Sequence, residues 1–337
     1  MADRGAGVRL PYLKGIRAAA ATIGPHHTPS PLIRSELLSR AFDADVWLKN
    51  ETFGPVASFK LRGALNALLL SAQADPATGW GAVSSSTGNH GQGVAYAARL
   101  LSRSADVFLP DGANPIKAKM IAALGAQLHI GGEDIDAAKA LAREFCDRHG
   151  HRFIDDGDDV DVIEGSGTVA LEVGEALENV DALVVPLGAG TFVGGCAAAL
   201  KGLQPAAQVI AVQAKGSPAM VESFHAGRPI ERPIDTIAGG LATRIPPAHA
   251  LAAMLEYVDD AWLVSDDELL SALRTLAECA HVMVEPAGAA STAGAWARRQ
   301  EFRGKRVVLV LSGSNVTREE LCLALDAAPM FELDDVS

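Results

Sequence analysis

The chain has 337 residues, of which 49% are hydrophobic and 21% are charged, and its formal net charge is −12. These proportions are typical of a folded globular protein and argue against a disordered chain. The acidic balance argues against a protein built mainly to bind nucleic acid or an anionic membrane surface. A chain of this length predicts about two domains of roughly 150 residues each.

Short apolar segments alternate with helix-like segments along most of the chain. Strands are predicted at residues 46–48, 82–84, 105–110, 126–130, 153–154, 181–186, 208–213, 262–264 and 306–311. Helices are predicted at residues 58–70, 88–100, 115–124, 134–149, 193–201, 266–280 and 288–299. This alternation predicts an α/β fold with parallel sheets that helices cover on both faces.

The cysteines and the N-terminus predict a cytoplasmic protein. No two of the four cysteines form a CxxC pair, which argues against a zinc ribbon or a dithiol motif and favours reduced thiols. The first residues lack the apolar core of a signal peptide. No apolar stretch reaches the about 18 residues of a membrane span, so we expect no membrane association.

Residues 155–161 contain five aspartates. Such a charged run is most often a solvated loop, and the alternatives are a metal site or a hinge. We predict a solvated loop at which the chain crosses between two domains.

Lys60 lies between Phe59 and Leu61 at the start of an apolar helix. One interpretation is a surface lysine whose ammonium reaches solvent past an apolar stem. The other is a desolvated amine, because burial favours the neutral form that acts as a nucleophile and forms a Schiff base.

Small and hydroxyl-bearing residues from Ser84 to Gly88 end a predicted strand and lead into a helix near Asn89 and His90. Backbone N–H groups at such a helix start can bind an anion such as a carboxylate. The alternative is an ordinary helix cap followed by a glycine turn.

Residues 184–195 read as a strand, a glycine turn and a helix, which is the geometry of a phosphate cradle. Val193 occupies the position of the third glycine in the dinucleotide-binding pattern. No acidic residue follows the next strand to hold a ribose. A phosphate site is therefore favoured over a dinucleotide site, with a purely structural turn as the alternative.

Ser312 directly follows the apolar strand at residues 306–311. A hydroxyl at the carboxyl end of a parallel strand lies where ligands usually bind, although a simple loop turn would look the same. A reactive lysine, a carboxylate loop, a phosphate cradle and a partner for a ring nitrogen are the four parts that a pyridoxal phosphate enzyme needs.

With these segments in this order, the chain resembles the serine/threonine dehydratase family of fold type II pyridoxal phosphate enzymes. It also resembles serine racemase. The resemblance runs from about His27 to about Asn315. Residues 51–64 resemble the lysine-attachment signature, residues 86–93 the S-x-G-N-H-x-Q-G loop and residues 188–195 the tetraglycine phosphate loop. Residues 285–288 and 312–315 resemble two later motifs of the family.

The resemblance implies an α/β fold of two domains with open parallel sheets and pyridoxal 5'-phosphate in the cleft between them. Residues 1–68 and 155–337 would form the large cofactor-binding domain, and residues 69–154 would form a small mobile domain. The implied assembly is a homodimer.

The resemblance also implies a role for each site residue. Lys60 would form the Schiff base, Phe59 would pack on the cofactor ring, Asn89 would bind its hydroxyl, Ser312 would face its nitrogen, and Glu285 would support the site. The phosphate would be held by Gly188, Ala189, Gly190, Thr191 and Phe192. The substrate carboxylate would be bound by Ser86, Thr87, Gly88 and His90.

The implied activity is that of a dehydratase or ammonia-lyase. It would convert a β-hydroxy amino acid, L-threonine or L-serine by default, to a 2-oxo acid and ammonia. The freed Lys60 would take the Cα proton. The neutral hydroxyl of Ser312 would leave the ring a weaker electron sink than a carboxylate would, which favours prompt elimination.

The chain departs from the family pattern in four places. Ala189 and Thr191 replace glycines of the phosphate loop, and the Thr191 hydroxyl could reach the phosphate. Thr87 brings a hydroxyl that could deliver a proton to the opposite face of the substrate, so an amino-acid racemase is the alternative. Residues 211–219 lack the acidic residues of a racemase-like cation site, so no metal is expected there. Residues 237–241 have glycine where relatives often have Asp.

The glycine in residues 237–241 points to a different β-hydroxy amino acid, such as hydroxyaspartate, phenylserine or a product of compatible-solute breakdown. A β-replacement enzyme is disfavoured, because such relatives usually have threonine where this chain has His90. The alternative from another class is a non-catalytic nucleotide-binding module, which would need no reactive lysine.

Overall fold

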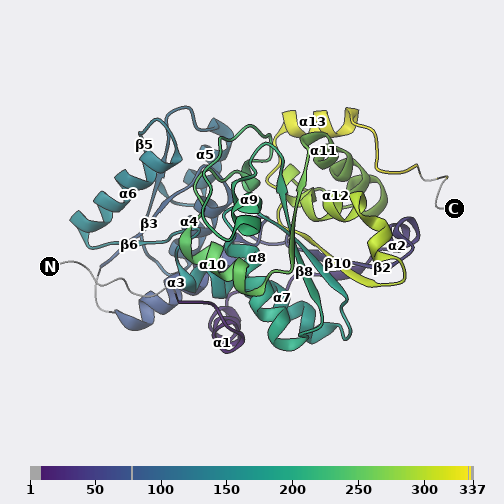
Figure 1. Ribbon diagram of the computed structural model, residues 1–337. Helices are drawn as coiled ribbons and strands as arrows, with labels where there is room; N and C mark the ends of the chain where they lie inside the picture. Colours follow the sequence, from purple (N-terminus) through teal and green to yellow (C-terminus); the bar gives the residue numbers. More distant parts are fainter. Residues whose placement is uncertain (1–8, 77–78, 333, 335–337) are drawn as a thin grey trace.

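The computed structural model describes residues 9–76, 79–332 and 334. Two sheets, each covered by helices, lie side by side (Figure 1). No helix in the described part of the chain combines the length and the apolar character needed to cross a membrane.

The larger sheet has six strands in the order β1-β2-β10-β7-β8-β9. Only β1 runs antiparallel to its neighbour. Its strands are β1 (Leu32–Arg34), β2 (Asp45–Asn50), β7 (Ala182–Pro186), β8 (Gln208–Ala214), β9 (Asp260–Val264) and β10 (Arg306–Leu311).

The smaller sheet has four parallel strands in the order β5-β4-β3-β6. They are β3 (Ala82–Ser85), β4 (Ala105–Leu109), β5 (Gln127–Ile130) and β6 (Arg152–Phe153). The chain thus builds β2, then the whole smaller sheet, and then returns to the larger sheet at β7.

The α-helices fall into two groups along the chain. Those before and within the smaller sheet are α1 (Leu13–Ile23), α2 (Glu36–Phe42), α3 (Lys60–Ala74), α4 (Asn89–Leu100), α5 (Pro115–Ala123) and α6 (Ile135–His149). Those after it are α7 (Val160–Ala176), α8 (Thr191–Leu203), α9 (Ala219–Ala226), α10 (Ala248–Tyr257), α11 (Asp266–Thr275), α12 (Ala290–Ala297) and α13 (Arg318–Asp326). Short 3-10 or π turns are η1 (Gly239–Leu241), η2 (Leu276–Ala280), η3 (Pro286–Ala289) and η4 (Arg299–Phe302).

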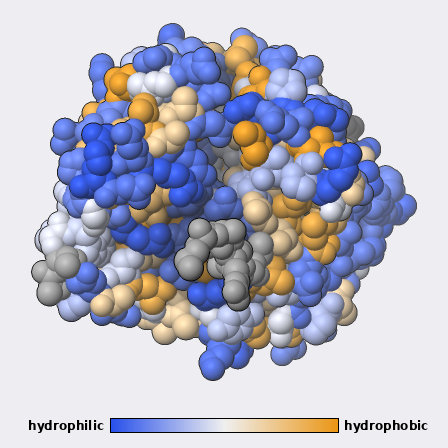
Figure 2. Space-filling model, turned by 60° about the vertical axis from the view of Figure 1, so that its left-hand side comes forward, coloured by the Kyte–Doolittle hydropathy of each residue, from blue (hydrophilic) through white to orange (hydrophobic). Residues whose placement is uncertain are grey.

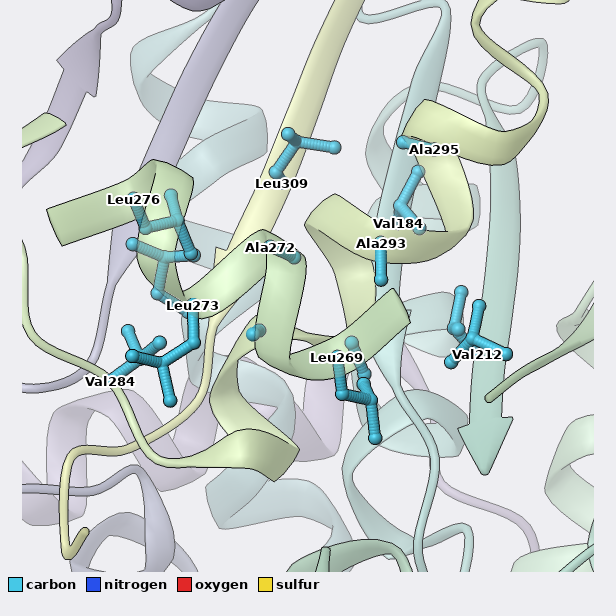
Figure 3. Packing of buried hydrophobic residues seen from close by; sticks show 14 of the residues in the cluster. Val184, Val212, Leu269, Ala272, Leu273, Leu276, Val284, Ala293, Ala295 and Leu309 are labelled. Carbon is cyan, nitrogen blue, oxygen red and sulfur yellow. The ribbon is translucent and has the colours of Figure 1, made fainter. Parts of the chain in front are cut away.

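The larger sheet separates two hydrophobic cores, because successive strand residues point to opposite faces. On β10, Val307 and Leu309 enter one core and Val308 and Val310 enter the other. Figure 3 shows the first core, in which side chains of α11 and α12 such as Leu269 pack over the strands. Because helices cover both faces of the larger sheet, its central strands are almost continuously apolar. The face in Figure 2 is mostly hydrophilic, with hydrophobic residues in small groups.

The predicted α/β fold with parallel sheets is confirmed. The predicted strands coincide with β2 to β10 to within one or two residues at each end. No helix is predicted at α7, because Gly165, Gly167 and Gly174 lower the helix propensity of this segment. These glycines allow close packing: a Cβ at Gly165 would lie 2.7 Å from the Arg62 carbonyl of α3, and one at Gly167 2.6 Å from the Gly195 carbonyl of α8.

The prediction of a solvated loop at residues 155–161 is wrong for two of its aspartates. Asp155 and Asp159 are only 6% and 7% exposed. Asp155 pairs with Lys139 at 2.8 Å and with Arg143 at 2.6 Å. Asp159 caps α7 and pairs with Arg152 of β6. This segment does carry the chain out of the smaller sheet, since it lies between β6 and α7.

Candidate active site

Parallel strands bring the loops that follow them to the same edge of each sheet. In the larger sheet, residues 51–59 follow β2, the glycine turn follows β7, and Ser312 follows β10, which lies between these two strands. In the smaller sheet, Ser86 follows β3, and Asp155 and Asp156 follow β6. The predicted site residues are therefore gathered at strand ends.

One pocket collects residues from both sheets. Of the predicted site residues, it is lined by Phe59, Lys60, Ser86, Thr87, Gly88, Asn89, His90, Ala189, Glu285 and Ser312. Lys117, Asp156, Gly239, Gly240, Ala242 and Ala287 complete its wall. Gly188, Gly190, Thr191 and Phe192 are not among the lining residues, although they flank Ala189 in the chain.

Lys60 is the first residue of α3, and its position is fixed by the end of β10. The backbone N–H of Phe59 donates to the Ser312 carbonyl at 3.1 Å, and Ser58 forms a β-bridge with Gly313. The Lys60 side chain is 17% exposed. Its Nζ donates to both carboxylate oxygens of Asp156, at 2.6 Å to Oδ1. The surface interpretation of Lys60 is therefore wrong, because its ammonium lies inside the pocket.

A buried cluster of ion pairs fixes the first turn of α3. Arg62 is fully buried and donates to Glu51 at 2.8 Å and to Glu172 of α7 at 2.5 Å. Burial alone would lower the pKa of this guanidinium, but the two carboxylates raise it above its usual value. Lys49 of β2 also pairs with Glu172. Opposite charges thus compensate one another two residues away from Lys60.

The glycine turn has the form of an anion site. Gly190 adopts a φ of +94°, which favours glycine, and stands at the N-cap of α8. No described side chain caps this helix start, so its backbone N–H groups remain available to a phosphate. A Cβ at Gly188 would collide with the Gly240 carbonyl, so the turn packs closely on η1.

Two side chains of this turn point elsewhere than expected. The Thr191 hydroxyl donates to the Asp156 carbonyl at 2.7 Å, so any phosphate contact of Thr191 falls to its backbone N–H. The Phe192 ring stacks on Phe59, with centroids 3.7 Å apart and an interplanar angle of 10°. The turn and the lysine segment are therefore in direct contact.

The loop after β3 presents the start of α4 to the pocket. The Gly88 N–H donates to the Ser86 hydroxyl at 3.2 Å, and Asn89 is the first helical residue. Thr87 is exposed between them. His90 is only 3% exposed, and its Nε2 lies 3.0 Å from the Ile154 carbonyl. This arrangement suits a carboxylate, because unpaired N–H groups and the helix dipole favour negative charge.

Asn89 is held at both ends of its amide. Its Nδ2 donates to the buried Glu285, and its Oδ1 accepts from Asn315 at 2.7 Å. Burial raises the pKa of the Glu285 carboxyl. Glu285 thus orients the Asn89 amide. Asn315 is a functional neighbour that the sequence analysis did not single out, although it lies within the last matching motif.

The site fits pyridoxal phosphate. Lys60, Ala189 just before the uncapped start of α8, and Ser312 at the end of β10 line one pocket, and these positions suit the aldehyde, the phosphate and the ring nitrogen. Within residues 9–76, 79–332 and 334, no group of three or more His, Cys, Asp or Glu side chains is arranged to hold a metal ion.

The chain matches the family described as pyridoxal-phosphate dependent enzyme over residues 23–313. It belongs to this family. The pyridoxal-phosphate enzyme is 33% identical over 308 residues to an L-threo-3-hydroxyaspartate ammonia-lyase of Saccharomyces cerevisiae, covering 91% of this chain and 94% of that protein. It is 34% identical over 306 residues to an L-threonine ammonia-lyase of Thermotoga maritima, covering 90% and 75%.

The fold of this pyridoxal-phosphate enzyme is that of maize serine racemase, with a TM-score of 0.86, 26% identity and coverage of 94% of this chain and 97% of that one. The predictions of fold type II, of the cofactor and of a pyridoxal phosphate-dependent lyase are confirmed. The alternative of a non-catalytic nucleotide-binding module does not agree with this family membership.

Proposed function

We propose that this enzyme is a dehydratase that acts on a β-hydroxy amino acid, with L-threonine or L-serine as the default substrate. The Cα–H and Cβ–O bonds break, water leaves, and hydrolysis of the remaining enamine gives a 2-oxo acid and ammonia. The observation that carries this proposal is the convergence of Lys60, Ala189 and Ser312 on one pocket. The ammonia-lyase activities named for its relatives support it.

Each site residue has a role in this proposal. When bound, the cofactor withdraws electrons from the Cα–H bond of the substrate. Lys60 Nζ carries the cofactor and, once released, takes the Cα proton. The Ser312 hydroxyl would lie opposite the ring nitrogen and, being neutral, would not hold a proton there. Phe59 would pack against the ring, and Asn89, which Glu285 orients, would donate to the ring hydroxyl.

The two anionic groups are assigned to the two helix starts. The turn from Gly188 to Phe192 binds the phosphate through the N–H groups at the start of α8. Ser86, Thr87, Gly88 and His90 surround the substrate carboxylate at the start of α4. This division supports a single productive orientation of the substrate between the two sheets.

An amino-acid racemase is the second candidate. It is favoured by Thr87, whose exposed side chain lines the pocket and could carry a proton to the second face of Cα. Product analysis separates the two: a dehydratase releases a 2-oxo acid and ammonia, whereas a racemase releases the D-amino acid.

The substrate class is a further part of the proposal. Besides threonine and serine, hydroxyaspartate and phenylserine are candidates, and hydroxyaspartate is the substrate named for one relative. Gly239 lines the pocket, and no described atom lies within 4 Å of where its Cβ would be, so the pocket has room beside it. Initial rates with a panel of β-hydroxy amino acids would rank these substrates.

Three wider features remain proposals. We assign residues 69–154 to a small mobile domain that closes on the substrate, and residues 1–68 and 155–337 to the large domain. The salt bridge between Arg244 and Asp136 at the rim of an adjoining pocket is consistent with such closure. We also propose a cytoplasmic homodimer. The four free thiols of the chain agree with a reducing compartment. Analytical ultracentrifugation would test the dimer.

Lys60→Ala tests the central role. The variant should lose the visible absorbance of the bound cofactor and all measurable turnover, while its circular dichroism stays that of the wild type. Lys14→Ala, at an exposed lysine of α1, is the matched control and should retain both. Turnover retained by Lys60→Ala would refute the assignment.

A further inference from the structure

Asp156 is a charged group in the active-site pocket to which the reaction above gives no role. It lies in the loop between β6 and α7, and its side chain is 29% exposed. Its backbone is fixed, because its carbonyl accepts from the Thr191 hydroxyl. Its carboxylate accepts from Lys60 Nζ. A carboxylate therefore stands where the reacting amine is held.

The Asp156 carboxyl is ionised at neutral pH. Burial would raise its pKa, but the neighbouring Lys60 ammonium brings it below the usual value. In the proposed reaction, Lys60 is engaged by the cofactor when the substrate arrives. Its ammonium then no longer lies against Asp156, and burial would raise the pKa of this carboxyl unless another cation took that place.

His90 places a second hydrogen-bond acceptor beside the Asp156 carboxylate. The Ile154 carbonyl can only accept, so Nε2 of His90 carries the hydrogen of that contact. In the neutral ring, Nδ1 is then an acceptor. This buried Nδ1 has no hydrogen-bond partner among the described residues, and it lies 3.8 Å from Asp156 Oδ1. Two acceptors thus face one spot with no donor between them once Lys60 is withdrawn.

Neighbouring charges are already paired and do not compete for this spot. Asp155 pairs with Lys139, and Asp136 of the adjoining pocket pairs with Arg244. Lys117, which lines the active-site pocket, lies 3.8 Å from Glu320. Asp156 also lines the adjoining pocket, so a side chain reaching past the substrate Cβ would pass it.

We propose that Asp156, with Nδ1 of His90 beside it, binds the side chain of the substrate and selects a β-hydroxy amino acid that carries a second amino group. An ammonium has three N–H donors and a positive charge, so it would satisfy both acceptors and replace the Lys60 ammonium. A substrate with a second carboxylate, such as hydroxyaspartate, would be repelled. This inference rests on the proposed function, because it takes Lys60 as the residue that carries the cofactor.

Binding of three non-eliminating analogues to the holoenzyme tests the inference. 2,4-Diaminobutanoate, 2-aminobutanoate and aspartate share the α-amino and α-carboxylate groups but end in a cation, a methyl group and an anion. Calorimetric titration gives each Kd without turnover. We expect the diamine to bind about tenfold or more tighter than 2-aminobutanoate, the factor for one charge-assisted hydrogen bond, and aspartate to bind weakest.

Asp156→Asn removes the charge and keeps the shape, so it should reduce the preference for the diamine to about threefold or less. Asp158→Asn is the control from the same loop. Asp158 accepts from the His249 N–H, and this variant should keep the wild-type preference.

The inference is overturned if aspartate binds best, if the wild type shows no preference, or if Asp156→Asn weakens all three analogues equally. The last result would make Asp156 only a counterion of Lys60. Absorbance of the bound cofactor is measured in parallel: its persistence in Lys60→Ala would instead overturn the proposed function.

Discussion

The Thr191 hydroxyl donates a hydrogen bond of 2.7 Å to the backbone carbonyl of Asp156. Thr191 belongs to the proposed phosphate turn and begins α8, whereas Asp156 belongs to the loop that leaves the smaller sheet. The bond therefore joins the proposed phosphate site to the carboxylate that holds Lys60. It also gives a structural reason for threonine at a position where glycine is expected.

Thr191→Val should destabilise the protein by about 1 kcal/mol, because it keeps the shape but leaves the Asp156 carbonyl without its donor. Urea denaturation measures this loss. Thr191→Ser keeps the hydroxyl and should restore most of the hydrogen-bond contribution. An equal loss for serine and valine would show that the methyl group, not the hydroxyl, is what the site needs.

Ser312→Asp should slow elimination about tenfold or more. A carboxylate facing the ring nitrogen would hold a proton there and make the ring a stronger electron sink, which favours side reactions over prompt loss of the β-hydroxyl. Initial rates of 2-oxo acid formation are the readout. Ser312→Ala, which adds no charge, is the control and should be impaired less. An unchanged rate in Ser312→Asp would contradict the role given to Ser312.

Glu285→Ala should weaken cofactor binding, because Asn89 loses the acceptor that orients its amide. The expected loss is about 1–3 kcal/mol, the range for a buried polar group left without its partner. Equilibrium titration of the cofactor-free protein gives the Kd. Glu285→Gln still offers an acceptor oxygen and should retain most of the affinity. If both variants bind as the wild type does, Glu285 does not position Asn89.

Stability should fall as the pH drops from about 6.5 to about 4 because of His27. Burial, which leaves its Nε2 without a described partner, and the nearby Arg62 lower the pKa of His27 from 6.5 to about 4. In this window the unfolded chain binds a proton at His27 that the folded chain does not. The contribution of His27 to the free energy of unfolding is therefore complete above pH 6.5 and decreases toward pH 4. The contribution is at most about 3 kcal/mol.

The free energy of unfolding at several pH values tests this expectation. His27→Asn should flatten the dependence between pH 6.5 and 4. The same change at the exposed neighbour His26 should leave the wild-type slope. A slope that survives in His27→Asn would assign the acid sensitivity to other groups.

Much of the site could be predicted because its signals are local. Lys60, Asn89 and Ser312 each follow or begin a regular element, and parallel sheets bring such positions to one edge. Patterns of a few neighbouring residues are therefore enough to predict that these three residues lie close together. The strands of the larger sheet were equally accessible, since burial on both faces makes them apolar runs such as residues 306–311.

Asp156 could not be placed in this way. Its role depends on Lys60, which is 96 residues away in the chain, while its own neighbours are four other aspartates typical of solvent. Arg62 poses the same problem. Its complete burial follows from Glu51 and Glu172, and only the tertiary structure brings Glu172 to it. Charges compensated over long distances in sequence leave no local pattern.

The chain reaches the smaller sheet through α3, which begins at Lys60, and leaves it through the loop that contains Asp156, and the salt bridge between these two residues joins the two connections. An insertion whose ends meet can change internally while its attachment points stay fixed. Substitutions within residues 82–153 can therefore alter the part of the pocket wall near Lys117 without moving the backbone that positions Lys60.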